Sequence, residues 1–293
     1  LAAAPLAVVL ESSIRNDVGA SLIHRELRSS LDLGWLEEFH HRAPALAKTL
    51  QPVRVSPAMV FANVDLWATG EWAIGDRALA AAAGVFLLVW ILAQGGILTH
   101  LASPDLRFAW SSFLAGGGTY FFRFLRLAVV TGAAYYGIYR LAFRIFPAIE
   151  RWARDVTSES RVLALHLAGL AAIALLMALV HLVADFARVA TVREKRRSML
   201  LALARGAMLV GRHPLTTLTV FITMLLLLGA VQVLYFWLAP GVGGASPVAV
   251  LLAFLVGQLY IVVRWALRIA RYGAELSLFD SWSAPPRGSN PQS

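Results

Sequence analysis

The chain has 293 residues, of which 59% are hydrophobic and only 15% are charged, and its mean hydropathy is +0.68. A soluble domain has about one quarter charged residues, so this composition excludes an ordinary soluble fold and indicates that lipid surrounds much of the chain. The net charge of +9 is explained first by basic residues in cytoplasmic loops, rather than by nucleic-acid binding. The absence of cysteine excludes disulfides, iron–sulfur clusters and thiol catalysis.

The first residues are apolar up to Glu11. We interpret residues 1–11 as the end of a transmembrane helix whose beginning lies outside the sequence, because this run alone is too short to cross a bilayer. The hydrophobic region of a signal peptide is the alternative.

Residues 12–77 are of mixed polarity and predict a small extracytoplasmic cap of helices. Asp32 is a suitable N-cap for a helix that contains Trp35 and Phe39, and Ser56-Pro57 is a second helix start. Four potential metal ligands occur in this segment: His24, Glu38, His40 and His41. Adjacent histidines on a helix point about 100° apart, so we predict no metal site and no cofactor.

Five further apolar runs are about 20 residues long, the length that crosses the hydrocarbon core of a bilayer. They are residues 79–101, 120–139, 162–184, 215–238 and 248–263. With the truncated first helix, the sequence predicts an all-α, polytopic transmembrane bundle of six spans, five of them within residues 78–278. Lys and Arg are concentrated in 188–212 and after 263, so the positive-inside rule places both termini in the cytoplasm. Residues 279–293 are rich in Pro and Ser and predict a disordered cytoplasmic tail.

Two segments between the spans are predicted to be interfacial helices, at about residues 105–119 and 194–212. In the first, Gly116-Gly117-Gly118 predicts a hinge between a surface helix and the next span. In the second, helical spacing separates Glu194, Ser198, Arg205 and Arg212 from Met199, Leu203, Ala207 and Val210. This pattern predicts an apolar face in the acyl boundary and arginines directed toward lipid phosphates.

Arginines recur at helical spacings near several span ends. Those predicted to contact anionic lipid headgroups are Arg196, Arg197, Arg205, Arg212, Arg264, Arg268 and Arg271. A further stripe, on the predicted outer side, consists of Arg140, Arg144, Arg151 and Arg154, with Pro147 as a predicted kink. Anchoring is the simpler interpretation of each stripe. The outer one opposes the topology rule, however, and a requirement to bind an acidic residue of the cap or a lipid phosphate would explain it.

Polar residues inside the spans form the candidate intramembrane site. His181, Asp185 and Arg188 follow one another at spacings of four and three, so they lie on one helix face. They could relay protons or hold a charged solute, or they could form an ion pair that closes a helix bundle. Single glutamines in three other spans complete the set: Gln94, Gln232 and Gln258. These amides either hydrogen-bond between helices or line a polar cavity.

Several pieces of the chain are similar to a group of uncharacterised bacterial multi-span membrane proteins. They are residues 33–39 (LGWLEEF), 50–52 (LQP), Ser56-Pro57 and the junction 184–189 (ADFARV). The span, junction and amphipathic helix also resemble, more weakly, the six-helix membrane domain attached to some glycerophosphodiester phosphodiesterases. The resemblance implies a six-helix bundle with interfacial helices. It implies no activity, because the catalytic phosphodiesterase domain is absent from this chain.

No catalytic sequence motif is present. We therefore expect a non-enzymatic protein of a bacterial inner membrane that interacts with anionic membrane lipids or with a protein partner, and not with nucleic acid. The alternative is a small transporter or lipid-handling protein whose cavity is lined by the polar residues of the spans.

Overall fold

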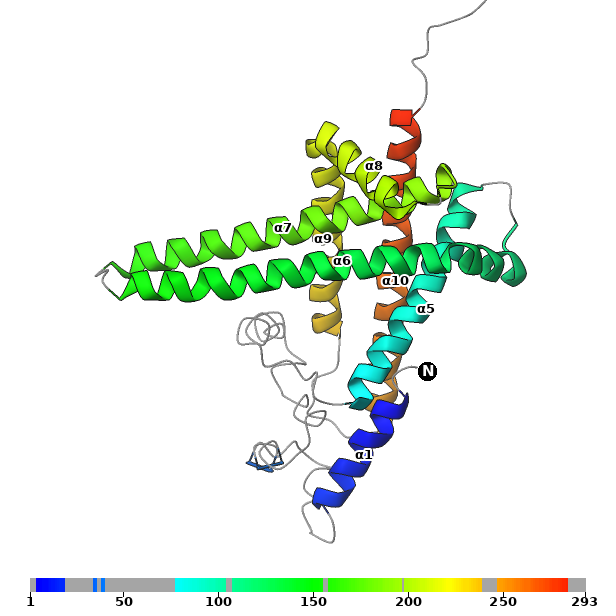
Figure 1. Ribbon diagram of the computed structural model, residues 1–293. Helices are drawn as coiled ribbons and strands as arrows, with labels where there is room; N and C mark the ends of the chain where they lie inside the picture. The colour runs from blue at the N-terminus through cyan, green and yellow to red at the C-terminus, as the bar shows by residue number, and fades with distance from the viewer. Residues whose placement is uncertain are drawn as a thin grey trace, which may run out of the picture. The chain divides into compact units, whose positions relative to one another are not determined.

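The computed structural model describes residues 4–18, 34–35, 38–39, 77–103, 107–154, 158–196, 198–238 and 247–283. Over these residues the chain is helical without strands, which confirms the predicted all-α fold. The helices are α1 (Ala4–Val18), α5 (Arg77–Ala102), α6 (Trp110–Ala153), α7 (Glu159–Arg193), α8 (Met199–Arg212), α9 (Pro214–Leu238) and α10 (Pro247–Ser283), as shown in Figure 1. Five of them, α5, α6, α7, α9 and α10, are long and apolar enough to cross a membrane.

The chain divides into two compact units, and α5, α9 and α10 contribute residues to both. The first unit comprises Leu1–Val89 and Leu226–Leu267, and the second comprises Trp90–Leu225 and Arg268–Ser293. In the first unit, α1 continues past the predicted boundary at Glu11, where Arg15 pairs with Glu11 at 2.7 Å. Trp35 and Phe39 of the predicted cap stack on each other with their centroids 5.1 Å apart and pack against α1. Most of the cap, including Asp32 and Ser56-Pro57, lies outside the described residues.

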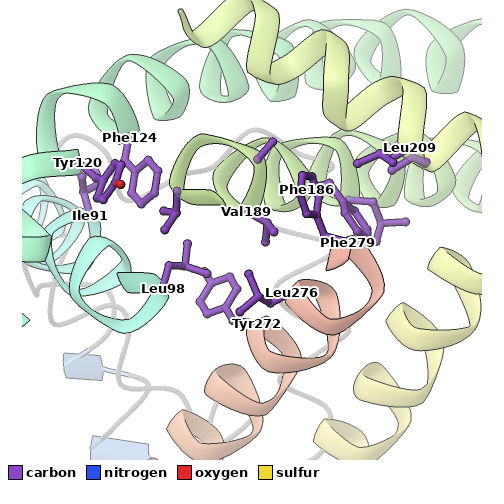
Figure 2. Close-up of a cluster of buried hydrophobic side chains, with 14 residues drawn as sticks. Ile91, Leu98, Tyr120, Phe124, Phe186, Val189, Leu209, Tyr272, Leu276 and Phe279 are labelled. Carbon is purple, nitrogen blue, oxygen red and sulfur yellow. The ribbon is translucent and has the colours of Figure 1, made fainter. Parts of the chain in front are cut away.

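The core of the second unit is built from α5, α6, α7, α8 and α10. In Figure 2, Tyr272, Leu276 and Phe279 of α10 lie against Phe186 and Val189 of α7. The predicted disordered tail therefore begins too early: α10 continues through Ser283 because Phe279 is buried in this core.

The prediction of a surface helix and a glycine hinge at 105–119 is wrong. Helix α6 starts at Trp110 and continues without a break through Gly116 and Gly117, and also through Pro147. A Cβ atom on Gly117 would lie 2.7 Å from the carbonyl oxygen of Leu92, and one on Gly116 would lie 2.8 Å from Thr99 Oγ1. These glycines therefore let α5 and α6 approach closely, as small residues do between membrane helices.

Helix α8 also differs from its prediction. It starts at Met199 rather than at 194, and the N-cap is Ser198, whose hydroxyl accepts a hydrogen bond from the Leu201 amide. Its crossing with α7 is close, since a Cβ atom on Gly206 would lie 2.5 Å from the Val183 carbonyl oxygen. Met199 and Val210, predicted to enter the acyl boundary, are instead buried within the protein. At these two positions the helix face predicted to meet lipid packs within the protein, while Leu203 is half-buried and Ala207 is exposed.

Candidate functional site

The last turns of α7 place three ionisable side chains together, as their spacing predicts. His181, Asp185 and Arg188 lie on successive turns, and Arg188 donates a hydrogen bond to Asp185 Oδ1. Nε2 of His181 lies 3.3 Å from Oδ2 of the same carboxylate. Asp185 is 0% exposed, so its charge is separated from solvent and depends on cationic partners such as Arg188.

Helix α10 completes the cluster with Arg271 and Glu275, which are one helical turn apart. Arg271 Nη2 lies 2.8 Å from Asp185 Oδ2, and its Nε lies 3.4 Å from Glu275 Oε1. Glu275 is 2% exposed. We name Asp185, Arg188, Arg271, Glu275 and His181 the charge cluster. Its two carboxylates and two guanidinium groups balance in formal charge when the imidazole is neutral.

The position of Arg271 fixes the tautomer of His181. Arg271 Nη1 lies 2.8 Å from His181 Nε2, and a guanidinium group can only donate hydrogen bonds. Nε2 of a neutral imidazole therefore accepts, and the ring proton lies on Nδ1. Nδ1 lies 3.2 Å from the hydroxyl oxygen of Tyr135 on α6, to which it donates. The cluster thus connects α6, α7 and α10.

The cluster continues to α5 through a tyrosine. Gln94 is buried and its Nε2 donates a hydrogen bond of 3.0 Å to the hydroxyl oxygen of Tyr272, the neighbour of Arg271 on α10. Three atoms of the charge cluster form no aligned hydrogen bond with the described residues: Asp185 Oδ2, Arg271 Nε and Glu275 Oε2. Two of them, Asp185 Oδ2 and Arg271 Nε, nevertheless lie at ion-pair distance from Arg271 Nη2 and Glu275 Oε1.

The structure brings four of the six predicted polar site residues together. His181, Asp185 and Arg188 are in contact, and Gln94 joins them through Tyr272. The other two glutamines belong to the first unit. Gln232 accepts a hydrogen bond from Tyr260, and Gln258 is exposed.

No sequence pattern predicted a role for Glu275, Tyr272 or Tyr135, and the stripe that contains Arg271 predicted a lipid contact. Arg271 and Glu275 carry opposite charges at a spacing of four just after the apolar run of α10, and this was the available signal. The prediction that Arg271 contacts lipid is wrong, because its side chain is largely enclosed by the charge cluster.

Other predicted lipid-binding arginines have partners within the protein. Arg196 and Arg205 both pair with Glu194, and the guanidinium carbon of Arg268 lies 4.4 Å from the centroid of the Trp90 ring. Arg212 and Arg264 are exposed, and Arg197 lies outside the described residues.

Within the described part of the chain, no group of three or more His, Asp or Glu side chains could hold a metal ion. His24, His40 and His41 lie outside that part. Comparisons with protein-family models, curated proteins and solved structures give no match. The resemblance to uncharacterised bacterial membrane proteins therefore stays a prediction.

Proposed function

We propose that this chain is a non-enzymatic, multi-pass protein of a bacterial inner membrane that interacts with anionic lipids through its surface helices. The observation that carries the proposal is the outer face of α8. Leu200 is 72% exposed and Met208 is 45% exposed, while the opposite face of the helix packs on α7. An apolar helix face bordered by arginines is typical of a helix that lies in the membrane interface.

Arginines border this face, and among the described residues they differ in whether they have a partner. Arg205 pairs with Glu194, whereas Arg212, at the end of α8, is exposed and forms no ion pair with the described residues. We therefore propose that Leu200, Leu201 and Met208 enter the acyl boundary and that Arg212 contacts lipid phosphates. This face replaces the one predicted from the sequence, since it lies on a different side of the same helix.

Fluorescence quenching tests this arrangement, and the natural chain has no cysteine to interfere. Single variants Leu200→Cys and Met208→Cys are labelled with an environment-sensitive dye in nanodiscs that contain phosphatidylglycerol. Lys195→Cys, in the exposed turn before α8, is the control. We expect lipid-borne quenchers to reach the two α8 labels and aqueous iodide to reach the Lys195 label. Iodide quenching of the α8 labels would refute the lipid contact, and shielding from both quenchers would indicate a protein partner.

Affinity purification in mild detergent tests the wider proposal. Mass spectrometry of the purified protein should find phosphatidylglycerol or another anionic lipid enriched over its share of the membrane. Recovery of neither an enriched anionic lipid nor a stoichiometric protein partner would contradict an interaction role.

A small transporter is the second candidate, and the charge cluster is the observation that favours it. Ionisable groups within membrane helices mark proton or solute paths in many transporters, and the chain of contacts runs from Tyr135 through His181 to buried Asp185. The closeness of a histidine to a carboxylate is also what an intramembrane enzyme would need. Here, however, Asp185 faces two arginines, so the geometry favours a closed ion-pair cluster.

The transporter candidate is tested by reconstitution. Proteoliposomes carrying the natural chain should then show a proton leak or a solute-coupled proton flux that Asp185→Asn abolishes. Proton movement through this site would be excluded if the proton flux were equal in three samples: protein-free vesicles, vesicles with the natural chain and vesicles with the variant.

A further inference from the structure

The register of α6 against α7 can be read from contacts along the two helices, which run side by side in opposite directions (Figure 1). Tyr135 contacts His181, and the ring of Phe146 stacks on that of His166 with centroids 6.3 Å apart. A Cβ atom on Gly169 would lie 3.4 Å from Ile149 Cδ1. This register places residues 138–154 of α6 beside residues 159–176 of α7. We call this pair of segments the α6–α7 arm.

The register offsets the apolar runs of the two helices. The apolar run of α6, residues 120–139, lies beside the part of α7 that holds the charge cluster. The apolar run of α7 lies beside the arginine-bearing part of α6. The helices have 44 and 35 residues, or about 66 Å and 52 Å at 1.5 Å per residue, against a hydrocarbon core of about 30 Å. If the apolar run of α7 crossed that core upright, the α6 arginines would lie within it, which is strongly unfavourable.

The arginines of the arm lie on the side of α6 that faces away from α7. At about 100° per residue, Arg140, Arg144 and Arg151 fall within about 40° of one another, and Ile149, which contacts α7, lies roughly opposite. The stripe of Arg140, Arg144, Arg151 and Arg154 is exposed along its whole length. None of the four forms an ion pair with a residue in the described ranges.

From Val162 onward, the α7 side of the arm is apolar apart from His166. Residues 162–180 contain no Asp, Glu, Lys or Arg. Leu163 is 60% exposed, and Leu167 and Leu175 are also exposed. Trp152 of α6 is exposed between the arginines, where an aromatic side chain suits the boundary between headgroups and acyl chains. The arm is thus a two-helix unit with one cationic side and one apolar side.

We infer that the α6–α7 arm lies along the membrane surface, with the α7 leucines in the acyl boundary and the α6 arginines bound to phosphates of anionic lipids. The inference rests on the proposed lipid interaction and locates a second, larger contact for it. An amphipathic unit with arginines on one side and leucines on the other has the design of an interfacial helix. Lipid phosphate also supplies the counter-charge that the described protein does not supply to these four arginines.

Depth measurement tests the orientation. Spin labels are attached to Gly137→Cys and Ala148→Cys on the exposed side of α6, and to Leu163→Cys and Ala174→Cys on α7, all of which are exposed positions. Each pair is 11 residues, or about 16 Å, apart along its helix and on one face. We expect equal depth within each pair, shallow for α6 and deep for α7, from collision with oxygen and with a water-soluble nickel complex. A depth that changes along each helix by most of that length would show that the arm crosses the bilayer and would overturn the inference.

Lipid binding tests the ligand. Arg144→Gln/Arg151→Gln is compared with Arg107→Gln/Arg126→Gln, which removes the same charge from exposed arginines outside the arm. Each arginine near an anionic surface multiplies the affinity roughly fivefold. We therefore expect the arm variant to bind phosphatidylglycerol about 25-fold more weakly in detergent titrations, and the control to bind it nearly as the natural chain does.

The outcomes separate the two proposals. If the natural chain enriches no anionic lipid, the lipid interaction of the proposed function fails, while the depth measurement still decides the orientation of the arm. If anionic lipid is enriched and both double variants bind it equally, the arm is not the binding surface and the proposed function stands on α8.

Discussion

The free energy of unfolding should depend far more on Asp185 than on an exposed acidic residue. Asp185→Asn keeps the size of the side chain and removes its charge. At 2.8 Å from Arg271, with an effective dielectric constant of about 20, the lost Coulomb attraction is about 6 kcal/mol. The desolvation cost of several kcal/mol per buried ion offsets much of this in the intact cluster. Because the variant leaves Arg188 without its carboxylate partner and Arg271 with Glu275 alone, we expect a loss of about 3–5 kcal/mol.

A matched control is available at Asp280, which pairs with Arg193 where both side chains are partly exposed. Asp280→Asn makes the same chemical change and should cost only about 0–1 kcal/mol. Unfolding by SDS in mixed micelles, followed by tryptophan fluorescence, measures both losses. The double variant Asp185→Asn/Arg188→Gln restores charge balance and should recover part of the loss. Equal losses for the two single variants would refute the account of the charge cluster.

Three further predictions concern packing and helix ends, each measured by the same unfolding experiment. Gly206→Ala should lower the free energy of unfolding, because the new Cβ atom would meet the α7 backbone. Gly211 has open space around it, so Gly211→Ala should raise the free energy of unfolding by about 1 kcal/mol. A gain in stability from both variants would contradict the close crossing of α7 and α8. A double-mutant cycle of Gln94→Leu and Tyr272→Phe should give a coupling of about 0.6 kcal/mol, and no coupling would exclude their hydrogen bond. Ser198→Ala removes the N-cap of α8 and should lower the free energy of unfolding by about 1 kcal/mol, whereas Ser198→Gly should lower it by only about a few tenths of a kcal/mol. A larger loss for the glycine variant would argue against capping.

The five long helices could be predicted because each contains an apolar run of membrane-spanning length, and such runs are local in sequence. The residues at which these helices end could not be predicted in this way. The predicted span ends at Ala184, whereas helix α7 continues to Arg193, because Phe186 and Val189 are buried in the core. The polar residues among them looked like a surface segment. Their apolar neighbours are held by helices far away in the sequence, and no local pattern records that contact.

In the candidate site, too, contacts within one helix could be predicted and contacts between distant helices could not. His181, Asp185 and Arg188 could be grouped because three- and four-residue spacings place side chains on one helix face. Arg271 is 86 positions from Asp185 in the sequence, and nothing near either residue indicates that they meet. A stripe of arginines after an apolar run is compatible with lipid anchoring and with a buried ion pair. Only the identity of the facing helix separates the two.

The glycines show why such patterns need the tertiary structure for their meaning. Glycine costs about 1 kcal/mol relative to alanine inside a helix, so Gly116, Gly117 and Gly118 together predict a break. Helix α6 instead continues, because two of these residues have almost no space for a Cβ beside α5. Gly118, which has nothing within 4 Å of a Cβ position, has no such role. Three glycines therefore lower the intrinsic stability of helix α6, and two of them allow its close packing against α5. By the same reasoning, the exposed arginines of the arm, also unfavourable beside an apolar helix, indicate a contact that lies outside the described part of the chain.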